Sequence, residues 1–298
     1  MSRNTLIKTY TRRDILKAGT ASAIAVNFLP SRVFGANERI TMAGIGVGGK
    51  GGSDISGAGE VGEVIALCDC DFNRGGGAAK KWPKAKKFTD FREMLDKMGK
   101  DIDACTVSTP DHTHAPAAIR AMNQGIHVYC QKPLTHTVWE ARQMRLVAEK
   151  NKVCTQMGNQ GTASTGMREG VEALWAGAIG EIKECHVWTN RPVWPQAPGV
   201  TKRLPEQPVP DHVDWNSFIG PAEMRPYNSG YHPFKWRGWW DYGTGAMGDM
   251  ACHTANLAYM GCKLTQPNWV EPITVGPVNP ETFPAWAIVK LSSSAAVR

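Results

Sequence analysis

Short apolar runs alternate with longer segments of helical periodicity over residues 39 to about 158. The runs have the length of strands, and the segments between them repeat apolar side chains at spacings of three and four. The expected strands are 40–45, 64–68, 102–108, 127–130 and 153–157, and the expected helices are 49–57, 91–98, 115–124 and 138–151. This alternation predicts an α/β fold in which residues 36–158 form a doubly wound parallel sheet with helices on both faces.

The composition changes after residue 158, which predicts a second domain over residues 159–298. Nine of the eleven tryptophans lie at position 175 or later, and prolines crowd residues 192–233. A helix is expected at 165–176, a strand at 182–188 and another strand at 285–291, with long loops between them. Because the sequence stops at Arg298 just after the last of these, we expect the second domain to be small or incomplete.

Residues 1–35 have the pattern of an export leader. Residues 11–17 read Thr-Arg-Arg-Asp-Ile-Leu-Lys, a weakly apolar run covers 18–29, and 33–35 offer small residues at a cleavage site. The apolar run is too short for a confident membrane span, and no cysteine follows it to take a lipid. We expect export through the twin-arginine machinery to the periplasm or another extracytoplasmic location.

This leader accounts for most of the positive charge of the chain. The formal net charge is +7, and +5 of it lies in residues 1–35. A remainder near +2 gives little support to nucleic-acid binding. The sequence has eight cysteines and no CxxC pair. Since Cys68, Cys105, Cys130 and Cys154 lie in apolar runs, we expect mostly free thiols and no zinc site.

A glycine-rich turn follows the first expected strand, as Gly44-x-Gly46-x-x-Gly49. In a dinucleotide-binding unit the first glycine allows the turn, the second lets the backbone approach the pyrophosphate, and the third lets helix pack on strand. Asp69, twenty residues after Gly49, ends the second strand, where a carboxylate accepts the ribose hydroxyls. The motif predicts a nicotinamide dinucleotide site that favours NAD over NADP, although the nearby Arg74 keeps NADP open.

Lys132 follows the expected strand 127–130, between Gln131 and Pro133. The carboxyl ends of parallel strands form the ligand-binding edge of such a sheet. An ammonium there can hold a substrate hydroxyl and stabilise the oxyanion that forms as its proton leaves. We therefore predict that Lys132 is catalytic.

A second candidate group lies in residues 243–253, where glycines lead into an expected helix. Asp249 and His253 are four residues apart and share one face of that helix. Histidine titrates near neutrality and can accept the proton of an alcohol. Asp249 is expected to orient the imidazole or to grip a neighbouring hydroxyl.

Other polar and aromatic residues are expected to line the site. His112 and His114 invite a metal interpretation, but no third ligand is evident, so helix capping or cofactor lining is favoured. Asn159 follows the expected strand 153–157 and is a candidate to contact the nicotinamide or the substrate. Five tryptophans are expected to gather around the site, where aromatic faces suit the C–H faces of sugars: Trp188, Trp194, Trp236, Trp239 and Trp240.

Taken together, these motifs resemble the Gfo/Idh/MocA oxidoreductases. The likeness rests on the glycine turn, Asp69, residues 108–114 (Ser-Thr-Pro-Asp-His-Thr-His), Gln131-Lys132-Pro133 and Asp249-x-x-x-His253. It implies a Rossmann domain followed by an α/β domain with an open, mainly antiparallel sheet, often used for oligomerisation, and a catalytic set of Lys132, Asp249 and His253. The family usually has Glu-Lys-Pro, so Gln131 removes a negative charge beside the lysine.

The predicted site therefore has three parts. Catalysis is assigned to Lys132, Asp249 and His253. Cofactor contacts are assigned to Gly44, Gly46, Gly48, Gly49, Asp69, Thr109, Pro110, His114, Gln131 and Lys132. Substrate contacts are assigned to Asn159, Trp188, Arg191, Arg237 and His253.

Three functions remain open on these residues. The first is an exported, NAD-dependent oxidoreductase that acts on a secondary hydroxyl of a sugar, polyol or glycoside, with a tightly held cofactor. The second is an NAD-using glycosidase that works through a transient keto-sugar. The third is a catalytically silent, truncated binding protein. A homo-oligomer is expected if the second domain is complete.

Overall fold

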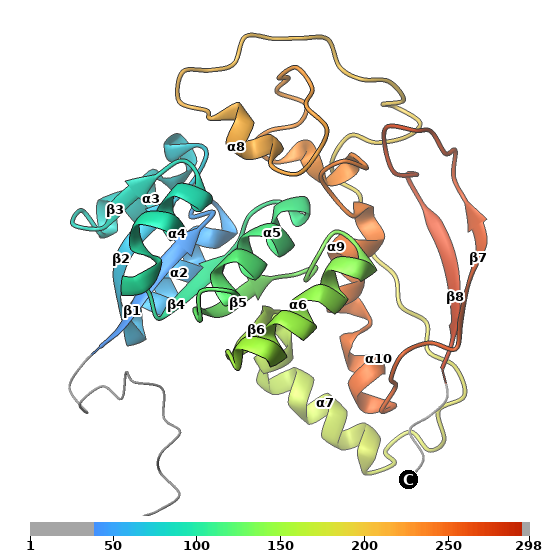
Figure 1. Ribbon diagram of the computed structural model, residues 1–298. Helices are drawn as coiled ribbons and strands as arrows, with labels where there is room; N and C mark the ends of the chain where they lie inside the picture. Colours follow the sequence, from blue (N-terminus) through green and yellow to red (C-terminus); the bar gives the residue numbers. More distant parts are fainter. Residues whose placement is uncertain (1–38, 294–298) are drawn as a thin grey trace, which may run out of the picture. The chain divides into compact units, whose positions relative to one another are not determined.

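The computed structural model describes residues 39–293 (Figure 1). The predicted leader, residues 1–35, lies outside this range. No helix in the described part of the chain combines the length and apolar character that crossing a bilayer requires.

Six parallel strands form the sheet of the N-terminal half, in the order β3-β2-β1-β4-β5-β6. Their bounds are β1 Ile40–Ile45, β2 Gly62–Cys68, β3 Lys86–Phe88, β4 Ala104–Val107, β5 His127–Gln131 and β6 Thr155–Gly158. The strand order reverses between β1 and β4, and ligands bind at such a switch point, outside the carboxyl ends of the strands. The predicted doubly wound parallel sheet is confirmed.

Five helices accompany this sheet, and two of them match the expected ranges residue for residue. The helices are α2 Lys50–Val61, α3 Phe72–Lys81, α4 Phe91–Met98, α5 Asp111–Met122 and α6 Val138–Asn151. The Asp90 carboxylate caps α4 by accepting from the Arg92 N–H. Thr137 and Glu140 cap α6 reciprocally, so local side-chain chemistry fixes where both helices begin.

Helix α3 and strand β3 were not expected from the sequence. Three consecutive glycines at 75–77 weaken helical propensity, and β3 is only three residues long. The Asp71 carboxylate caps α3 by accepting from the N–H groups of Asn73 and Arg74. A Cβ on Gly75 would lie 3.1 Å from Val47 Cγ2, so this glycine lets α3 approach the turn after β1.

The main core lies between the sheet and its helices and contains many small side chains. Residues Ala115, Ala117, Ala118 and Ala121 of α5 are all at most 1 % exposed, which lets this helix lie close to the strands. Cys68, Cys105 and Cys130 are buried as predicted. Cys154 is exposed, contrary to expectation, because it precedes the edge strand β6 and packs in no core. All eight cysteines are free.

Over residues 159–293 the structure has four α-helices and a two-stranded antiparallel sheet. Their bounds are α7 Thr165–Trp175, α8 Trp215–Ile219, α9 Gly245–Thr254, α10 Asn256–Gly261, β7 Trp269–Val275 and β8 Ala287–Ser292. The strand expected at 182–188 is wrong. Within residues 39–293 that segment pairs with neither β7 nor β8, and its side chains are nearly all exposed. An apolar pattern without a partner strand does not make a sheet.

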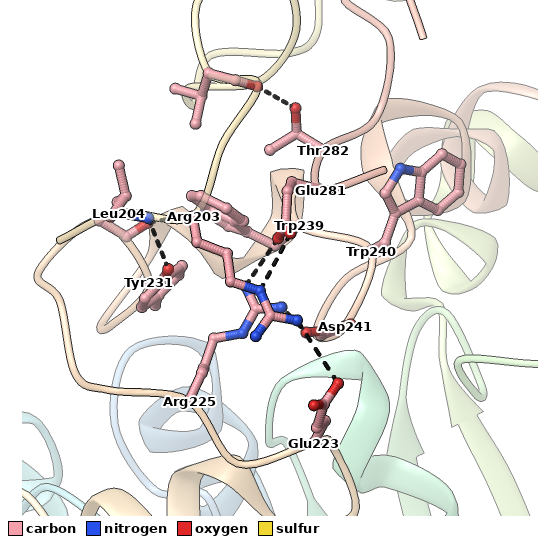
Figure 2. A network of polar contacts seen from close by, with 12 residues as sticks. Arg203, Leu204, Glu223, Arg225, Tyr231, Trp239, Trp240, Asp241, Glu281 and Thr282 are labelled. Atoms are coloured by element: carbon pink, nitrogen blue, oxygen red, sulfur yellow. Dashed lines mark hydrogen bonds and ion pairs between the residues drawn. The ribbon is translucent and has the colours of Figure 1, made fainter. Parts of the chain in front are cut away.

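An aromatic cluster around a buried arginine organises the long segment between α7 and α9. Arg225, 3 % exposed, pairs with Asp241 and with Glu281, whose Oε2 lies 3.4 Å from Nη1 (Figure 2). Its guanidinium also lies over the rings of Tyr231, Trp239 and Tyr242. A buried charge needs such partners, so this network fixes the turn that leads into α9.

This segment also binds the N-terminal half beside the end of β2. The Asp214 N–H donates to the Cys70 carbonyl at 2.8 Å. His232 Nε2 lies 2.8 Å from Asp71 Oδ2, and both side chains are buried. The carboxylate that caps α3 is thus shared with the C-terminal half.

Candidate functional site

The glycine turn after β1 forms a tight cradle at the switch point of the sheet. A Cβ on Gly46 (φ +75°) would lie 2.7 Å from the Ser108 carbonyl oxygen, at the end of β4. Gly49 has a φ of +54°, which glycine adopts freely. The helix-packing role expected of Gly49 belongs instead to Gly51, where a Cβ would meet the Gly46 carbonyl oxygen at 1.8 Å. Gly44 is tight against Val47 in the same way.

Asp69 lies against this turn, as the motif predicts, but its carboxylate already has partners. Oδ2 accepts from the N–H groups of Val47 and Gly48 at 2.8 and 2.9 Å, and Oδ1 accepts from Asp71 N–H. Burial raises the pKa of Asp69, and these backbone donors oppose the rise. Asp69 therefore stabilises the conformation of the turn through these hydrogen bonds, in addition to any contact with a ribose.

The glycine turn and the start of α2 fit the pyrophosphate group of a dinucleotide. The glycines leave space that any side chain would fill, and the first turn of α2 presents backbone N–H groups at a helix N-terminus. Arg74 lies over the cradle: its Nη2 would be 3.4 Å from a Cβ on Gly49. A guanidinium there can pair with a phosphate, so the structure keeps the question between NAD and NADP open.

Lys132, directly after β5, meets Asp249 of α9 across the two halves of the chain. Its Nζ donates to Asp249 Oδ1 at 2.8 Å and to the Asp249 carbonyl at 2.9 Å. Both side chains are 14 % exposed. Arg237 Nε lies 3.5 Å from the same Oδ1. The structure thus brings together Lys132, Asp249 and Arg237, three of the predicted site residues.

His253 lies one turn further along α9, four residues from Asp249. Partial burial and the positive charge of Lys132 lower the pKa of His253, while the Asp249 carboxylate opposes this. The imidazole is therefore neutral near pH 7 and able to accept a proton. Asp249 pairs with the side chains of Lys132 and Arg237 and forms no hydrogen bond with the His253 ring among the described residues. It therefore positions these two cations and not the imidazole.

Asp111, at the start of α5, belongs to the same charged group and was given no role from the sequence. It is 4 % exposed, and its Oδ2 accepts from Thr244 Oγ1 at 2.7 Å. Burial raises its pKa to about 6, against the opposing charges of Arg237 and Lys132. Because an aspartate at the start of a helix usually caps it, the sequence offered no reason to assign Asp111 to the site. In the structure its side chain forms no capping hydrogen bond on α5.

Gln131 has a specific partner that explains the amide in place of a carboxylate. Its Nε2 donates to Asp54 Oδ2 at 2.9 Å, and Ser108 Oγ donates to the same oxygen at 2.8 Å. Asp54 is a 4 % exposed carboxylate of α2, and Lys50 Nζ lies 2.6 Å from its Oδ1. The negative charge that the sequence lacks at 131 is thus present at 54.

Replacing Gln131 with glutamate is expected to lower the free energy of unfolding by about 1–3 kcal/mol above neutral pH. The change removes the hydrogen bond that the Gln131 amide donates to Asp54, and it places two carboxylates in contact. The loss should shrink as the pH falls and one carboxyl takes up a proton. Thermal unfolding of Q131E from pH 5 to 8 measures this. The double variant D54N/Q131E, which swaps amide and acid, should recover much of the stability; an equal loss in both variants would contradict the pairing.

Both ring nitrogens of His112 and of His114 lie against backbone carbonyl oxygens, and a neutral ring donates a hydrogen bond through one of its two nitrogens. The His114 ring nitrogens lie 2.8 Å from the carbonyl oxygens of Pro133 and Thr109. Those of His112 face the carbonyls of Phe218 and Tyr242. Burial lowers the pKa of both, that of His112 to about 4.

His114 is thus placed to join the Thr109–Pro110 turn to the Lys132 loop, and it is too enclosed to line a cofactor as predicted. Over residues 39–293, no three or more side chains of histidine, cysteine, aspartate or glutamate gather as a metal site would require. The metal interpretation gains no support from the geometry.

Asn159 reaches the site from the end of β6. Its Nδ2 donates to the Cys252 carbonyl at 2.7 Å, next to His253, and to Thr162 Oγ1. Its Oδ1 is buried without a hydrogen-bond partner. Asn159 therefore ties α9 to the sheet and keeps one acceptor free.

The predicted aromatic gathering forms only in part. Trp236 lies under the Arg237 guanidinium, 4.2 Å from the ring centre, and so borders the charged group. Trp239 is buried in the Arg225 cluster, because its bulk fills that core. Trp194 bonds Gln196, and Trp240 packs on Phe283.

Two further predicted substrate residues lie on the segment that forms no strand. Trp188 is exposed, and within residues 39–293 its ring forms no hydrogen bond or ring contact with Lys132 or His253. Arg191 has a buried Nε without a partner, and its N–H donates to Thr189 Oγ1. The structure therefore does not bring either residue to the charged group.

The sheet, the glycine cradle and the lysine–aspartate pair define the class: a two-domain oxidoreductase with a dinucleotide-binding Rossmann half. Two models of one family match the chain, the NAD-binding Rossmann fold over residues 39–159 and the C-terminal alpha/beta domain over residues 190–288. Together they cover more than half of the sequence. The chain belongs to the Gfo/Idh/MocA oxidoreductase family.

Curated relatives match less than half of the chain. Inositol 2-dehydrogenase of Salmonella typhimurium is 27% identical over 126 residues, 42% of this chain and 37% of that protein. The Rubrobacter xylanophilus enzyme of the same name is 28% identical over 154 residues, 49% of this chain and 42% of that protein. The chain thus spans about two-fifths of the length of these relatives.

A solved structure extends the likeness of fold to the second half. The WlbA dehydrogenase of Chromobacterium violaceum, in complex with NADH and UDP-GlcNAcA, superimposes with a TM-score of 0.62 at 19% identity, over 86% of this chain and 64% of that one. At this identity the match shows the shared fold, including the α/β domain after the Rossmann sheet.

Proposed function

We propose that this chain is an exported, NAD-dependent oxidoreductase that acts on a secondary hydroxyl of a sugar, polyol or glycoside. The single observation that carries the chemistry is the ion pair of Lys132 with Asp249, one helical turn from the neutral His253, beyond the end of β5. The names of the inositol dehydrogenases support a polyhydroxylated substrate. The twin arginines at positions 12 and 13 support export.

The three side chains divide the work on the substrate oxygen. His253, neutral near pH 7, accepts the hydroxyl proton. The Lys132 ammonium donates to the same oxygen and stabilises its developing negative charge. Asp249 keeps Lys132 in place through two contacts, at the carboxylate and at its own carbonyl. A bound nicotinamide would supply the acceptor for the hydrogen on carbon.

The cofactor is assigned to the cradle formed by Gly46, Gly49 and the start of α2. Asp69 at the end of β2 favours a ribose with a free 2′-hydroxyl, hence NAD. Since a twin-arginine substrate leaves the cytoplasm already folded, the dinucleotide would travel inside the protein. We propose that it is held tightly.

Mass spectrometry of nucleotide released from the full chain, purified from its native compartment, tests this assignment. NAD or NADH is expected at close to one molecule per chain. A matched variant with Gly46→Val, whose side chain would strike the Ser108 carbonyl, should release little or none. Release of NADP would refute the cofactor choice, and wild-type protein free of any dinucleotide would refute tight binding.

The same preparation distinguishes the proposed dehydrogenase from the alternative, an NAD-using glycosidase. A glycosidase that works through a transient keto-sugar would cleave glycosides with no net change of the cofactor's redox state. Net reduction of NAD on a panel of sugars and polyols supports the proposed dehydrogenase. Glycoside cleavage without it would favour the rival.

A further inference from the structure

Two cysteines of the C-terminal half lie close together although 77 residues separate them in sequence. Cys185 Sγ is 3.6 Å from Cys262 Sγ. Cys185 is exposed and Cys262 is partly exposed, so both thiols can be reached by a reagent in solution. Cys68, Cys105 and Cys130, in contrast, are buried in the sheet.

Cys262 is fixed on a rigid support. It follows α10 directly, and its N–H donates to the Ala258 carbonyl at 2.9 Å. Helices α7 and α10 pack side by side (Figure 1), with a Cβ on Gly261 only 2.3 Å from Leu174 Cδ1. Trp175 Nε1 donates to the Met260 carbonyl, which ties the two helix ends together.

Cys185, in contrast, lies on a segment with few constraints. Residues 181–190 form no helix or strand, and nearly all are exposed. Among residues 39–293, the sulfur contact is the only polar contact that joins this segment to an element outside residues 181–191; the others, such as His186 with Glu184, are internal. A segment with so few contacts can move easily.

We propose that Cys185 and Cys262 form a redox-controlled disulfide that anchors residues 181–190 to the end of α10. A bond of about 2.05 Å requires the sulfurs to approach by about 1.5 Å, which the loosely held segment allows. Because Trp188 and Arg191 follow Cys185 by three and six residues, the bond fixes the start of the long loop that carries them. The proposal does not depend on the hydride-transfer function.

The reaction is a thiol–disulfide exchange with a small-molecule or protein disulfide as oxidant. The Cys185 thiolate attacks one sulfur of the oxidant, forms a mixed disulfide and releases one thiolate. The Cys262 thiolate then attacks Cys185, forms the internal bond and releases the second thiolate. Two thiols of the protein are oxidised and one disulfide is reduced to two thiols. In the reduced protein, burial and the neighbouring Cys185 raise the pKa of Cys262, which disfavours Cys262 as the first nucleophile.

The test uses the full chain, reduced and then treated with oxidised glutathione. Peptide mapping without reductant should give a cross-linked peptide that contains Cys185 and Cys262, and two alkylatable thiols should disappear. The thermal midpoint should rise by about 5 °C or more, since the bond closes a long loop of the unfolded chain. Dithiothreitol should reverse both changes.

Three serine variants provide the comparison. C185S and C262S should lose the cross-link and the rise in thermal midpoint, whereas C154S, at another exposed cysteine, should retain both. An unchanged thiol count after oxidation, or a bond from Cys185 to any other cysteine, within or between chains, would overturn the proposal. The peptide map of the wild-type protein alone shows whether the cross-link forms. The test therefore remains decisive even if one of the variants does not fold.

Discussion

Replacing Lys132 with methionine is expected to lower turnover about 10³-fold, the range seen when one donor to a developing oxyanion is lost. Methionine keeps the length of the side chain and removes the ammonium. The neighbouring Asp249 retains Arg237 as a partner, so the fold should survive. Steady-state kinetics on whichever sugar or polyol the wild type oxidises measures the effect.

The control for this variant is Lys97→Met, which removes an exposed ion pair with Glu93. It should leave both turnover and dinucleotide binding unchanged. If K132M kept turnover within about threefold of the wild type, Lys132 could not be the oxyanion donor.

Removing the imidazole with His253→Ala is expected to lower kcat/KM by about 10²–10⁴-fold, the usual contribution of a general base. The dependence on pH gives the sharper evidence. Since the pKa of His253 is lowered from 6.5, the neutral ring persists below pH 6.5, and kcat/KM of the wild type should fall only under that value. In H253A this acid limb should disappear.

His186→Ala is the matched control, because this histidine is exposed in the same half of the chain. Its pH profile should follow the wild type. An acid limb that remained in H253A with the same midpoint would assign the titration to another group. Asp111, whose pKa is raised to about 6, is the group to examine next.

The N-terminal half could be predicted closely because its local signals agree with its global fold. The ranges of α4 and α6 follow from apolar spacing together with the caps at Asp90 and Thr137. Helix α3 was missed because its stability comes from the Asp71 cap and from close packing at Gly75, which three adjacent glycines conceal. Tertiary contacts override weak propensity there.

The sequence singled out Lys132, Asp249 and His253 as candidates, but it did not predict their contacts. Lys132 and Asp249 lie together, and His253 is on the same helix, as the motifs suggested. Pairwise spacing could not reveal that Asp249 holds Lys132 rather than the imidazole, nor that Asp54 pairs with Gln131. Those contacts join residues 117 and 77 positions apart, and only the packing of the elements sets them.

The long proline-rich region was the least predictable. Its order depends on Arg225 and the aromatic rings around it, a cluster with no sequence period. The strand expected at 182–188 had the composition of one but no neighbour to bond with.

The Lys132–Asp249 contact also bears on how such a protein can change over time. One partner belongs to the nucleotide-binding half and the other to the half that follows it. A chimaera built from the halves of two relatives would therefore have to restore this ion pair together with the contacts of Asp71, Cys70 and Asp111 that also join the halves.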